Sequence, residues 1–167
     1  MRIAHFEQVF GALQQAHVRF LVVGGVAVVA HGVVRYTNDL DLVFAFDEEN
    51  LRKGVQTLET LGFKTSVPIT ADAFANPENR RRWAQEKNML VFQMALFAED
   101  DLPIDIFLQP PFDFEQEYLN AVRCELAPDL FVPVVSLDRL IAMKRLAGRA
   151  RDLEDIANLE RLRGQKP

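Results

Sequence analysis

Residues 24–42 of the chain read GGVAVVAHGVVRYTNDLDL, and two carboxylates near the end of this stretch, Asp39 and Asp41, decide how the rest is interpreted. Side chains alternate between the two faces of a strand, so Asp39 and Asp41 point the same way. Two like charges held this close call for a cation between them. A hard divalent ion such as Mg²⁺ (or Mn²⁺) prefers carboxylate oxygens, so the pair predicts a metal site.

A double glycine, Gly24 and Gly25, opens the same stretch. It lies between a β-branched run at 18–23, which predicts a buried strand, and a short helix predicted at 26–32. Backbone N–H groups at the start of a helix bind anions, and glycine lets a phosphate approach closely. We therefore predict a phosphate site, with a plain tight turn as the alternative.

A third carboxylate, Asp105, lies between two isoleucines in a strand-like run at 103–108. An unpaired carboxylate in an apolar strand is costly to bury, and the same holds for Asp41 between two leucines. Asp39 alone could instead cap a turn together with Asn38. If the strands are neighbours, the three carboxylates would share one site for one or two Mg²⁺ ions.

The composition limits the classes of function. The chain has 167 residues, of which 49% are hydrophobic and 26% charged, which suits one soluble domain with a sizeable core. No run approaches the ~20 apolar residues of a membrane span, and the first residues lack the apolar segment of a signal peptide, so we expect a cytoplasmic protein. The single cysteine, Cys124, allows no internal disulfide and is expected to be a buried structural thiol.

The net charge of −5 argues against nonspecific nucleic-acid binding through a basic surface. A local basic groove remains open, because basic residues cluster at Arg80–Arg82 and between 144 and 163. A solvated helix face is the simpler interpretation of the first cluster, and its role stays open.

Periodicity and turn residues predict alternating helices and strands, without an internal repeat or linker. The predicted helices cover residues 4–16, 26–32, 48–61, part of 70–85, 114–119, 136–146 and 152–162. The predicted strands cover residues 18–23, 39–46, 63–67, 89–97, 103–108, 122–126 and 131–135, with a hairpin turn at 99–101.

Two segments carry a resemblance to a known family. The stretch from Gly24 to Leu42 resembles the nucleotidyltransferase superfold, which includes DNA polymerase beta and the aminoglycoside nucleotidyltransferases, and looks most like its bacterial AbiEii/AbiGii toxin type. Residues 144–156, KRLAGRARDLEDI, are similar to that group's C-terminal Lys…Ala…Arg…Lys-Asp-x-x-Asp-Ile segment.

The resemblance implies an α+β fold in which helices pack mainly on one face of a mixed sheet. It implies one domain, residues 1–167, with C-terminal helices 136–163 packing on the core. In this family's pattern Asp39, Asp41 and Asp105 would be catalytic residues and metal ligands, and Asp105 would help to activate an attacking hydroxyl. The implied nucleotide-binding residues are Gly24, Gly25, Arg35, Thr37, Lys144, Arg149 and Asp152.

Some of these roles have alternatives. Lys144 would reach the phosphates or the acceptor, but could be an exposed helical lysine. Arg35 could clamp a phosphate or pair with a carboxylate. His31 is expected to pack against or cap the end of its helix. Polymerase-type members commonly place a serine after the glycines where this chain has Val26, so the phosphate cradle would rely on backbone N–H groups.

The implied activity is metal-dependent transfer of a nucleoside monophosphate from a nucleoside triphosphate (NTP) to a hydroxyl acceptor. The acceptor would be a tRNA end, a protein or a small molecule, and the chain could be the toxin of a toxin–antitoxin pair with an antitoxin partner. The short chain leaves little room for a separate acceptor domain, so the acceptor stays open. A non-catalytic member that binds nucleotide or a partner is the alternative, and a metal-dependent phosphohydrolase is a weaker one.

Overall fold

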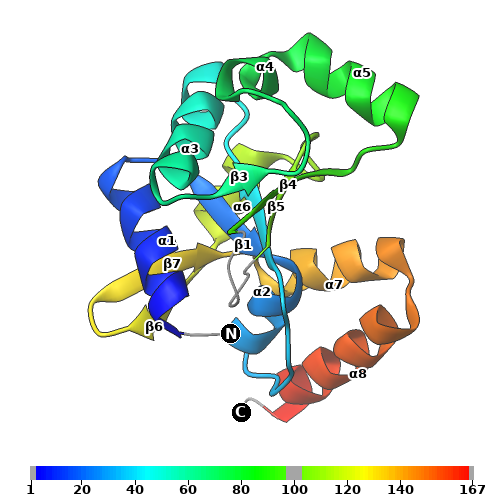
Figure 1. Cartoon of the computed structure of the whole chain (residues 1–167). Coiled ribbons are helices and arrows are strands. Elements are labelled where there is room, and N and C mark those ends of the chain that lie inside the picture. The colour runs from blue at the N-terminus through cyan, green and yellow to red at the C-terminus, as the bar shows by residue number, and fades with distance from the viewer. Residues whose placement is uncertain (1–2, 97–102, 166–167) are drawn as a thin grey trace.

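A mixed seven-stranded β-sheet forms the centre of the molecule in the computed structural model, which describes residues 3–96 and 103–165 (Figure 1). The strands are β1 Phe20–Val23, β2 Leu40–Phe44, β3 Lys64–Thr65, β4 Val91–Ala95, β5 Ile104–Phe107, β6 Val122–Ala127 and β7 Leu130–Val134. Their order in the sheet is β3-β4-β5-β2-β1-β7-β6. The pairs β1–β7 and β2–β5 are parallel and the others are antiparallel, which confirms the predicted mixed sheet.

Helices connect and cover these strands. Within the described residues they are α1 Ile3–Gln15, α2 Gly24–Ala30, α3 Glu48–Thr60, α4 Ala71–Ala75, α5 Pro77–Lys87, α6 Phe114–Asn120, α7 Leu137–Ala147 and α8 Ala150–Gln165. Figure 1 shows α1 and α3 side by side along one side of the sheet, and α2, α7 and α8 grouped away from them. None of the helices among the described residues is long and apolar enough to cross a membrane.

Side-chain caps fix the ends of several helices. The Asp47 carboxylate accepts a hydrogen bond from the Asn50 N–H at the start of α3. Likewise the Ser136 hydroxyl accepts one from the Arg139 N–H at the start of α7, as predicted. Such caps satisfy donors that have no partner within the helix. Gly148, with φ +63°, ends α7 in the left-handed conformation.

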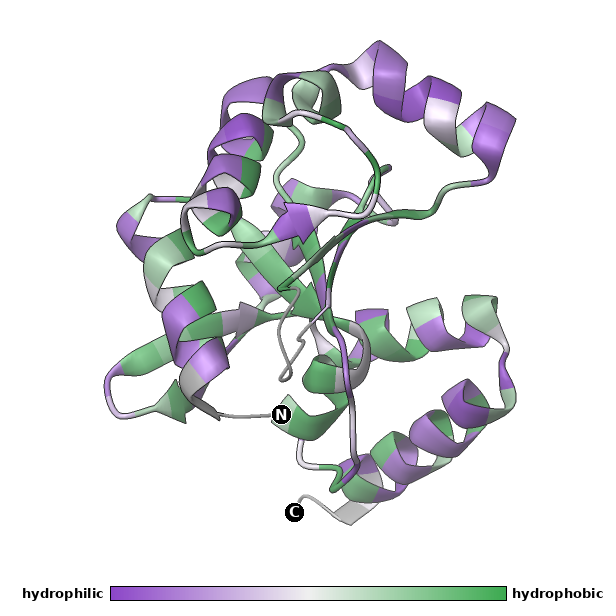
Figure 2. Cartoon of the chain, viewed as in Figure 1, coloured by the Kyte–Doolittle hydropathy of each residue, from purple (hydrophilic) through white to green (hydrophobic). Residues whose placement is uncertain are grey.

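Buried aromatic residues hold the sheet and its helices together. Phe6, Phe10 and Phe20 stack in series with ring centroids 5.9 and 5.7 Å apart, which joins α1 to β1. Phe74 of α4 stacks on Phe92 of β4 at 4.5 Å. Figure 2 shows the hydrophobic residues gathered in the central strands, whereas α5 is largely hydrophilic. Both C-terminal helices contribute to the same buried cluster, through Leu140, Ile141, Ile156 and Leu159.

Three of the element boundaries that differ from those expected bear on the site. Strand β2 begins at Leu40, so Asp39 lies just before it. Helix α2 begins at Gly24, because the positive φ of this glycine, +62°, turns the chain directly from β1 into the helix. Helix α8 begins at Ala150, where the Asp152 carboxylate accepts the Arg149 N–H. The turn predicted at 99–101 lies outside the described residues.

Candidate functional site

Two of the predicted carboxylates are brought together by the register of the sheet. Asp41 on β2 lies directly beside Asp105 on the parallel strand β5. Partners in register point to the same face of the sheet, so both carboxylates face one side. On the other flank of β5, Gln93 of β4 pairs with Asp105, and its amide donates a 2.8 Å hydrogen bond to the Asp105 carboxylate.

Asp39 joins them from the turn before β2. It lies two residues before Asp41, and the Thr37 hydroxyl donates a 2.8 Å hydrogen bond to its carboxylate. Thr37 is itself buried, so this hydrogen bond fixes the loop that enters β2. The negative charge of Asp39 also raises the pKa values of Asp41 and Asp105.

The glycine pair wraps closely around Asp41. A Cβ on Gly24 would lie 1.9 Å from Oδ2 of Asp41, and a Cβ on Gly25 would lie 2.3 Å from Oγ1 of Thr37. Real Cβ atoms do not approach other atoms this closely, so no larger residue fits without displacing these side chains. The Gly25 N–H donates to the Asp41 carboxylate, so the glycines hold this carboxylate as well as shaping the space beside it.

The environment of Asp41 and Asp105 favours their protonated forms. Burial, followed by the charges of Asp39 and Asp105, raises the pKa of Asp41 to about 6. The hydrogen bond from the Gly25 N–H and the charge of Lys144 lower this pKa in part. Burial also raises the pKa of Asp105, with a further increase from Asp39, while the hydrogen bond from Gln93 acts in the opposite direction. Such groups gain most from a nearby cation, because it removes their mutual repulsion.

The donor set suits a hard divalent cation. Within residues 3–96 and 103–165, no three His, Cys, Asp or Glu side chains lie close enough to complete a metal site from protein atoms alone. Each carboxylate accepts one hydrogen bond that orients it: Asp39 from Thr37, Asp41 from Gly25 and Asp105 from Gln93. Mg²⁺ is commonly bound by one or two carboxylates, with water and substrate phosphate completing its shell. The paired Asp41 and Asp105 fit that pattern.

A buried ionic cluster forms a second wall of the site. Lys144 is only 6% exposed, and its Nζ lies 3.1 Å from Asp152 Oδ1 and 2.7 Å from Asp155 Oδ2. The alternative of an exposed helical lysine is therefore wrong. Arg35 Nη1 lies 2.5 Å from Asp155 Oδ2, so Arg35 pairs with a carboxylate, which is one of its two expected roles.

Asp155 and Gln93 contact predicted site residues but were absent from the predicted set. Asp155 lies one helical turn after Asp152, so both carboxylates lie on the face of α8 that meets Lys144. The pairing of Gln93 with Asp105 cannot be read from sequence alone, because a shift of one residue in the register of β4 and β5 would turn Gln93 to the other face of the sheet.

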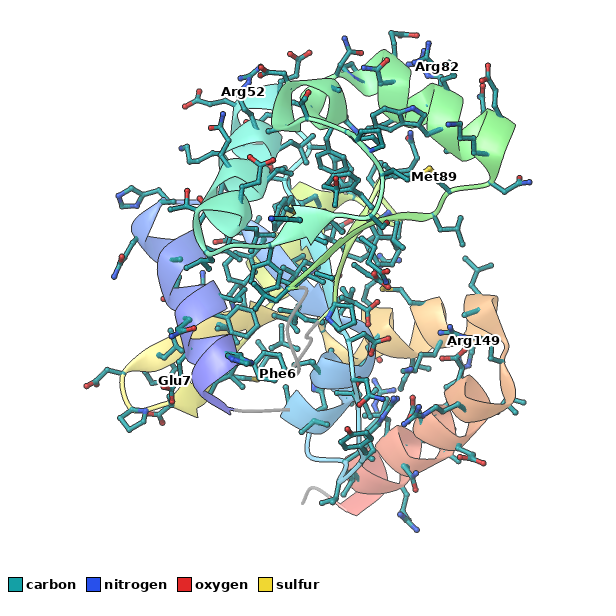
Figure 3. All side chains as sticks on the ribbon, in the orientation of Figure 1. Phe6, Glu7, Arg52, Arg82, Met89 and Arg149 are labelled. Carbon is teal, nitrogen blue, oxygen red and sulfur yellow. The ribbon has the colours of Figure 1, made fainter. Side chains whose placement is uncertain are left out.

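Arg149 is the most exposed cation of the cluster. Its side chain is 78% exposed, and its Nε donates a 2.7 Å hydrogen bond to Asp152. That hydrogen bond raises the pKa of Arg149, and the charges of Asp41 and Asp39 add to the increase. Burial opposes ionisation of Asp152, but hydrogen bonds from Arg149 and Lys144 lower its pKa overall. Figure 3 shows Arg149 at the junction of α7 and α8.

Other residues singled out in the sequence lie outside this cluster. His31 caps the end of α2, and its Nε2 lies 2.8 Å from the Val135 carbonyl oxygen, as expected for a packing role. Cys124 is half-buried in β6, and burial raises the pKa of its thiol.

The interpretation of Arg80–Arg82 as a solvated face is wrong for its first member. Arg80 is buried and donates hydrogen bonds to the carbonyl oxygens of Phe74 and Ala75, which closes the end of α4. Arg81 and Arg82 are exposed, and each contacts a residue one turn earlier in α5.

The fold belongs to the nucleotidyltransferase type. The antibiotic-resistance factor ANT(2'')-Ia, known from a solution structure, superposes with a TM-score of 0.60 at 15% identity, over 94% of this chain and 81% of that one. A putative nucleotidyltransferase from Thermotoga maritima gives 0.58 at 14% identity, over 98% and 92%. The lincosamide antibiotic adenylyltransferase LnuA, bound to lincomycin, gives 0.55 at 20% identity, over 89% of each chain. At identities this low, the structural similarity shows a shared fold and does not by itself show a shared function.

Sequence comparison identifies the family. Residues 9–167 match the family described as "Nucleotidyl transferase AbiEii toxin, Type IV TA system". The chain belongs to this family, which confirms the resemblance seen in its motifs. A search of curated proteins found no match.

Proposed function

We propose that the protein transfers a nucleoside monophosphate from an NTP to a hydroxyl acceptor. The acceptor oxygen would attack the α-phosphorus in line, forming a new P–O bond while the bond to the β-phosphate oxygen breaks and pyrophosphate leaves. The observation that carries this proposal is the in-register pairing of Asp41 and Asp105 beside the glycine pair.

Asp41 and Asp105 would hold Mg²⁺ (or Mn²⁺), with Asp39 near enough to add its charge, and the ion would neutralise charge on the phosphates. Asp105 would orient the acceptor hydroxyl and take up its proton, a role that its raised pKa supports. Gly24 and Gly25 let the start of α2 lie directly against Asp41 and Thr37, so its backbone N–H groups would bind the phosphates beside the carboxylates.

Positive charge for the nucleotide would come from the second wall. Arg149 is already exposed, and the charges of Asp41 and Asp39 act on it. It could therefore contact a phosphate bound beside these carboxylates without a rearrangement of the core. Lys144 would act from its buried position by setting the local potential, because both of its neighbouring carboxylates hold it in place. Arg35 and Thr37 would hold the loop before β2.

The family match supports a biological setting for this reaction. The chain would be the toxin of a toxin–antitoxin pair, would act in the cytoplasm where NTPs are abundant, and would be restrained by an antitoxin partner. An RNA, a protein or a small molecule could serve as the acceptor. The structurally similar ANT(2'')-Ia and LnuA, seen with adenylyl-2''-tobramycin and lincomycin, are examples with a small molecule.

The test is transfer of label from α-labelled NTPs. The purified chain is incubated with each NTP, Mg²⁺ and cell extract, and the extract is then separated into RNA, protein and small molecules. We expect label in one fraction with wild type and at least a hundredfold less with Asp41→Asn or Asp105→Asn.

Asp129→Asn is the matched control, because Asp129 is exposed, lies in the β6–β7 turn and has a positive φ that asparagine tolerates. It should transfer label as wild type does. If no fraction is labelled with any nucleotide, and Asp41→Asn has no effect on growth inhibition in cells, the catalytic proposal fails and the non-catalytic alternative replaces it.

A further inference from the structure

Strand β6 forms one edge of the sheet. It is the last strand in the order, and it pairs only with β7 among the described residues. The edge lies at the margin of the molecule (Figure 1). Backbone N–H and C=O groups on such an edge are free to pair with another strand.

The sequence of β6 is complementary to itself. In an antiparallel pair centred on Cys124, Arg123 of each copy would lie opposite Glu125 of the other. Both side chains are exposed, and neither has an ion-pair partner within residues 3–96 and 103–165. Opposite charges directly across a strand pair stabilise it, whereas like charges destabilise it.

Exposed apolar side chains surround the same edge. Val122 is 43% exposed at the start of β6, and Phe131, the β7 partner of Glu125, is 48% exposed. Leu119 is exposed three residues before β6, and Val29 is exposed beside Ala30, whose carbonyl oxygen lies 3.8 Å from the Cys124 sulfur. Apolar groups gathered around a polar edge are typical of a protein interface.

We propose that the chain forms a two-fold symmetric dimer by antiparallel pairing of β6 with β6 of a second copy. The irregularity between Glu125 and Ala127 limits regular pairing to the first part of the strand, so the dimer should be of micromolar affinity. Asp41 lies on β2, three strands from β6, or about 14 Å along the sheet. The carboxylate site therefore stays open in the dimer.

The test uses single charge reversals and their mixture. Wild type in sedimentation equilibrium from about 1 to about 300 µM should rise from 19.0 kDa toward twice that mass. Arg123→Glu places like charges opposite each other at both symmetric positions, and so does Glu125→Arg. Each variant alone should dimerise at least tenfold more weakly.

An equimolar mixture of the two variants distinguishes cross-strand charge pairing from a general effect of changed surface charge. In the mixed dimer both cross-strand pairs again join opposite charges, so the mixture should regain the wild-type dissociation constant, as should the double variant Arg123→Glu/Glu125→Arg. Arg82→Glu, an exposed reversal on α5, is the matched control and should dimerise like wild type.

A wild type that stays monomeric at every concentration overturns the proposal. So does a dimer that neither reversal weakens, or one that the mixture does not restore. Circular dichroism of each variant checks folding, and the restored mixture itself shows that both single variants retain a competent β6.

Discussion

The Asp41 carboxyl is held where its charge is disfavoured, and this has a cost to folding when no cation is bound. Burial and the neighbouring carboxylates raise its pKa to about 6, compared with about 3.9 in an unfolded chain. The folded state therefore binds this proton more tightly. The resulting stabilisation is fully present below about pH 4 and is lost as the pH rises through about 6.

Asp41→Asn should remove this dependence. Two pKa units correspond to about 3 kcal/mol, so in EDTA the variant should gain about 2–3 kcal/mol in free energy of unfolding, relative to wild type, between about pH 4 and about pH 7.5. Urea denaturation of both proteins at both pH values measures this difference. If the free energy of unfolding of the variant relative to wild type were the same at both pH values, Asp41 would ionise normally.

Gly24→Ala should both destabilise the fold and disrupt the site. The added methyl would lie 1.9 Å from Asp41 Oδ2, and φ +62° is strained for alanine, so we expect a loss of at least 1–2 kcal/mol. Gly11→Ala is the control, because Gly11 lies within α1 with no atom within 4 Å of the added Cβ, and should gain about 0.5–1 kcal/mol. Thermal unfolding distinguishes them, and equal shifts in the same direction would contradict the close approach.

At the scale of elements, helix α8 is tied to the rest of the molecule by buried and by exposed ion pairs. Asp155 is buried between Lys144 and Arg35, whereas Arg163 bonds Asp138 at the surface. Removing one partner of a buried pair leaves an uncompensated charge, but exposed pairs contribute little.

Asp155→Asn should therefore lower the free energy of unfolding by about 3 kcal/mol. Asp138→Asn, which removes one exposed ion pair to the same helix, should change it by less than about 1 kcal/mol. Denaturant titrations of both variants at neutral pH make the comparison. Similar losses from both would mean that Asp155 is not the tie that the buried geometry indicates.

These elements also show what sequence could predict. Local signals placed α3, α7 and the strand β1, because caps and β-branched runs act within a few residues. The partnership of Asp41 with Asp105 needed the strand order, which only the motif resemblance supplied. The partners of Lys144 and the burial of Arg80 depend on packing between elements. The charge pattern alone predicted an exposed face for Arg80, and an exposed helical lysine was the alternative for Lys144.

At the scale of the whole molecule, the carboxylate site joins elements that are far apart in the chain. Its first wall comes from α2, β2, β4 and β5, and its second from α7 and α8. A ligand that contacts both walls would stabilise the entire fold, because unfolding any of these elements would release it.

We therefore expect Mg²⁺ or Mn²⁺ together with a non-hydrolysable NTP to raise the melting temperature. At about 100 times the dissociation constant the gain is about 2.7 kcal/mol, or about 5–10 °C for a chain of this size. Asp41→Asn and Asp105→Asn should abolish the shift, since each replaces a carboxylate proposed to bind the cation with a neutral amide, whereas Asp129→Asn should keep it. Differential scanning calorimetry with metal alone, nucleotide alone and both tests this. If nucleotide alone gave the full shift in EDTA, the carboxylates would not be metal ligands, and their pairing would need another explanation.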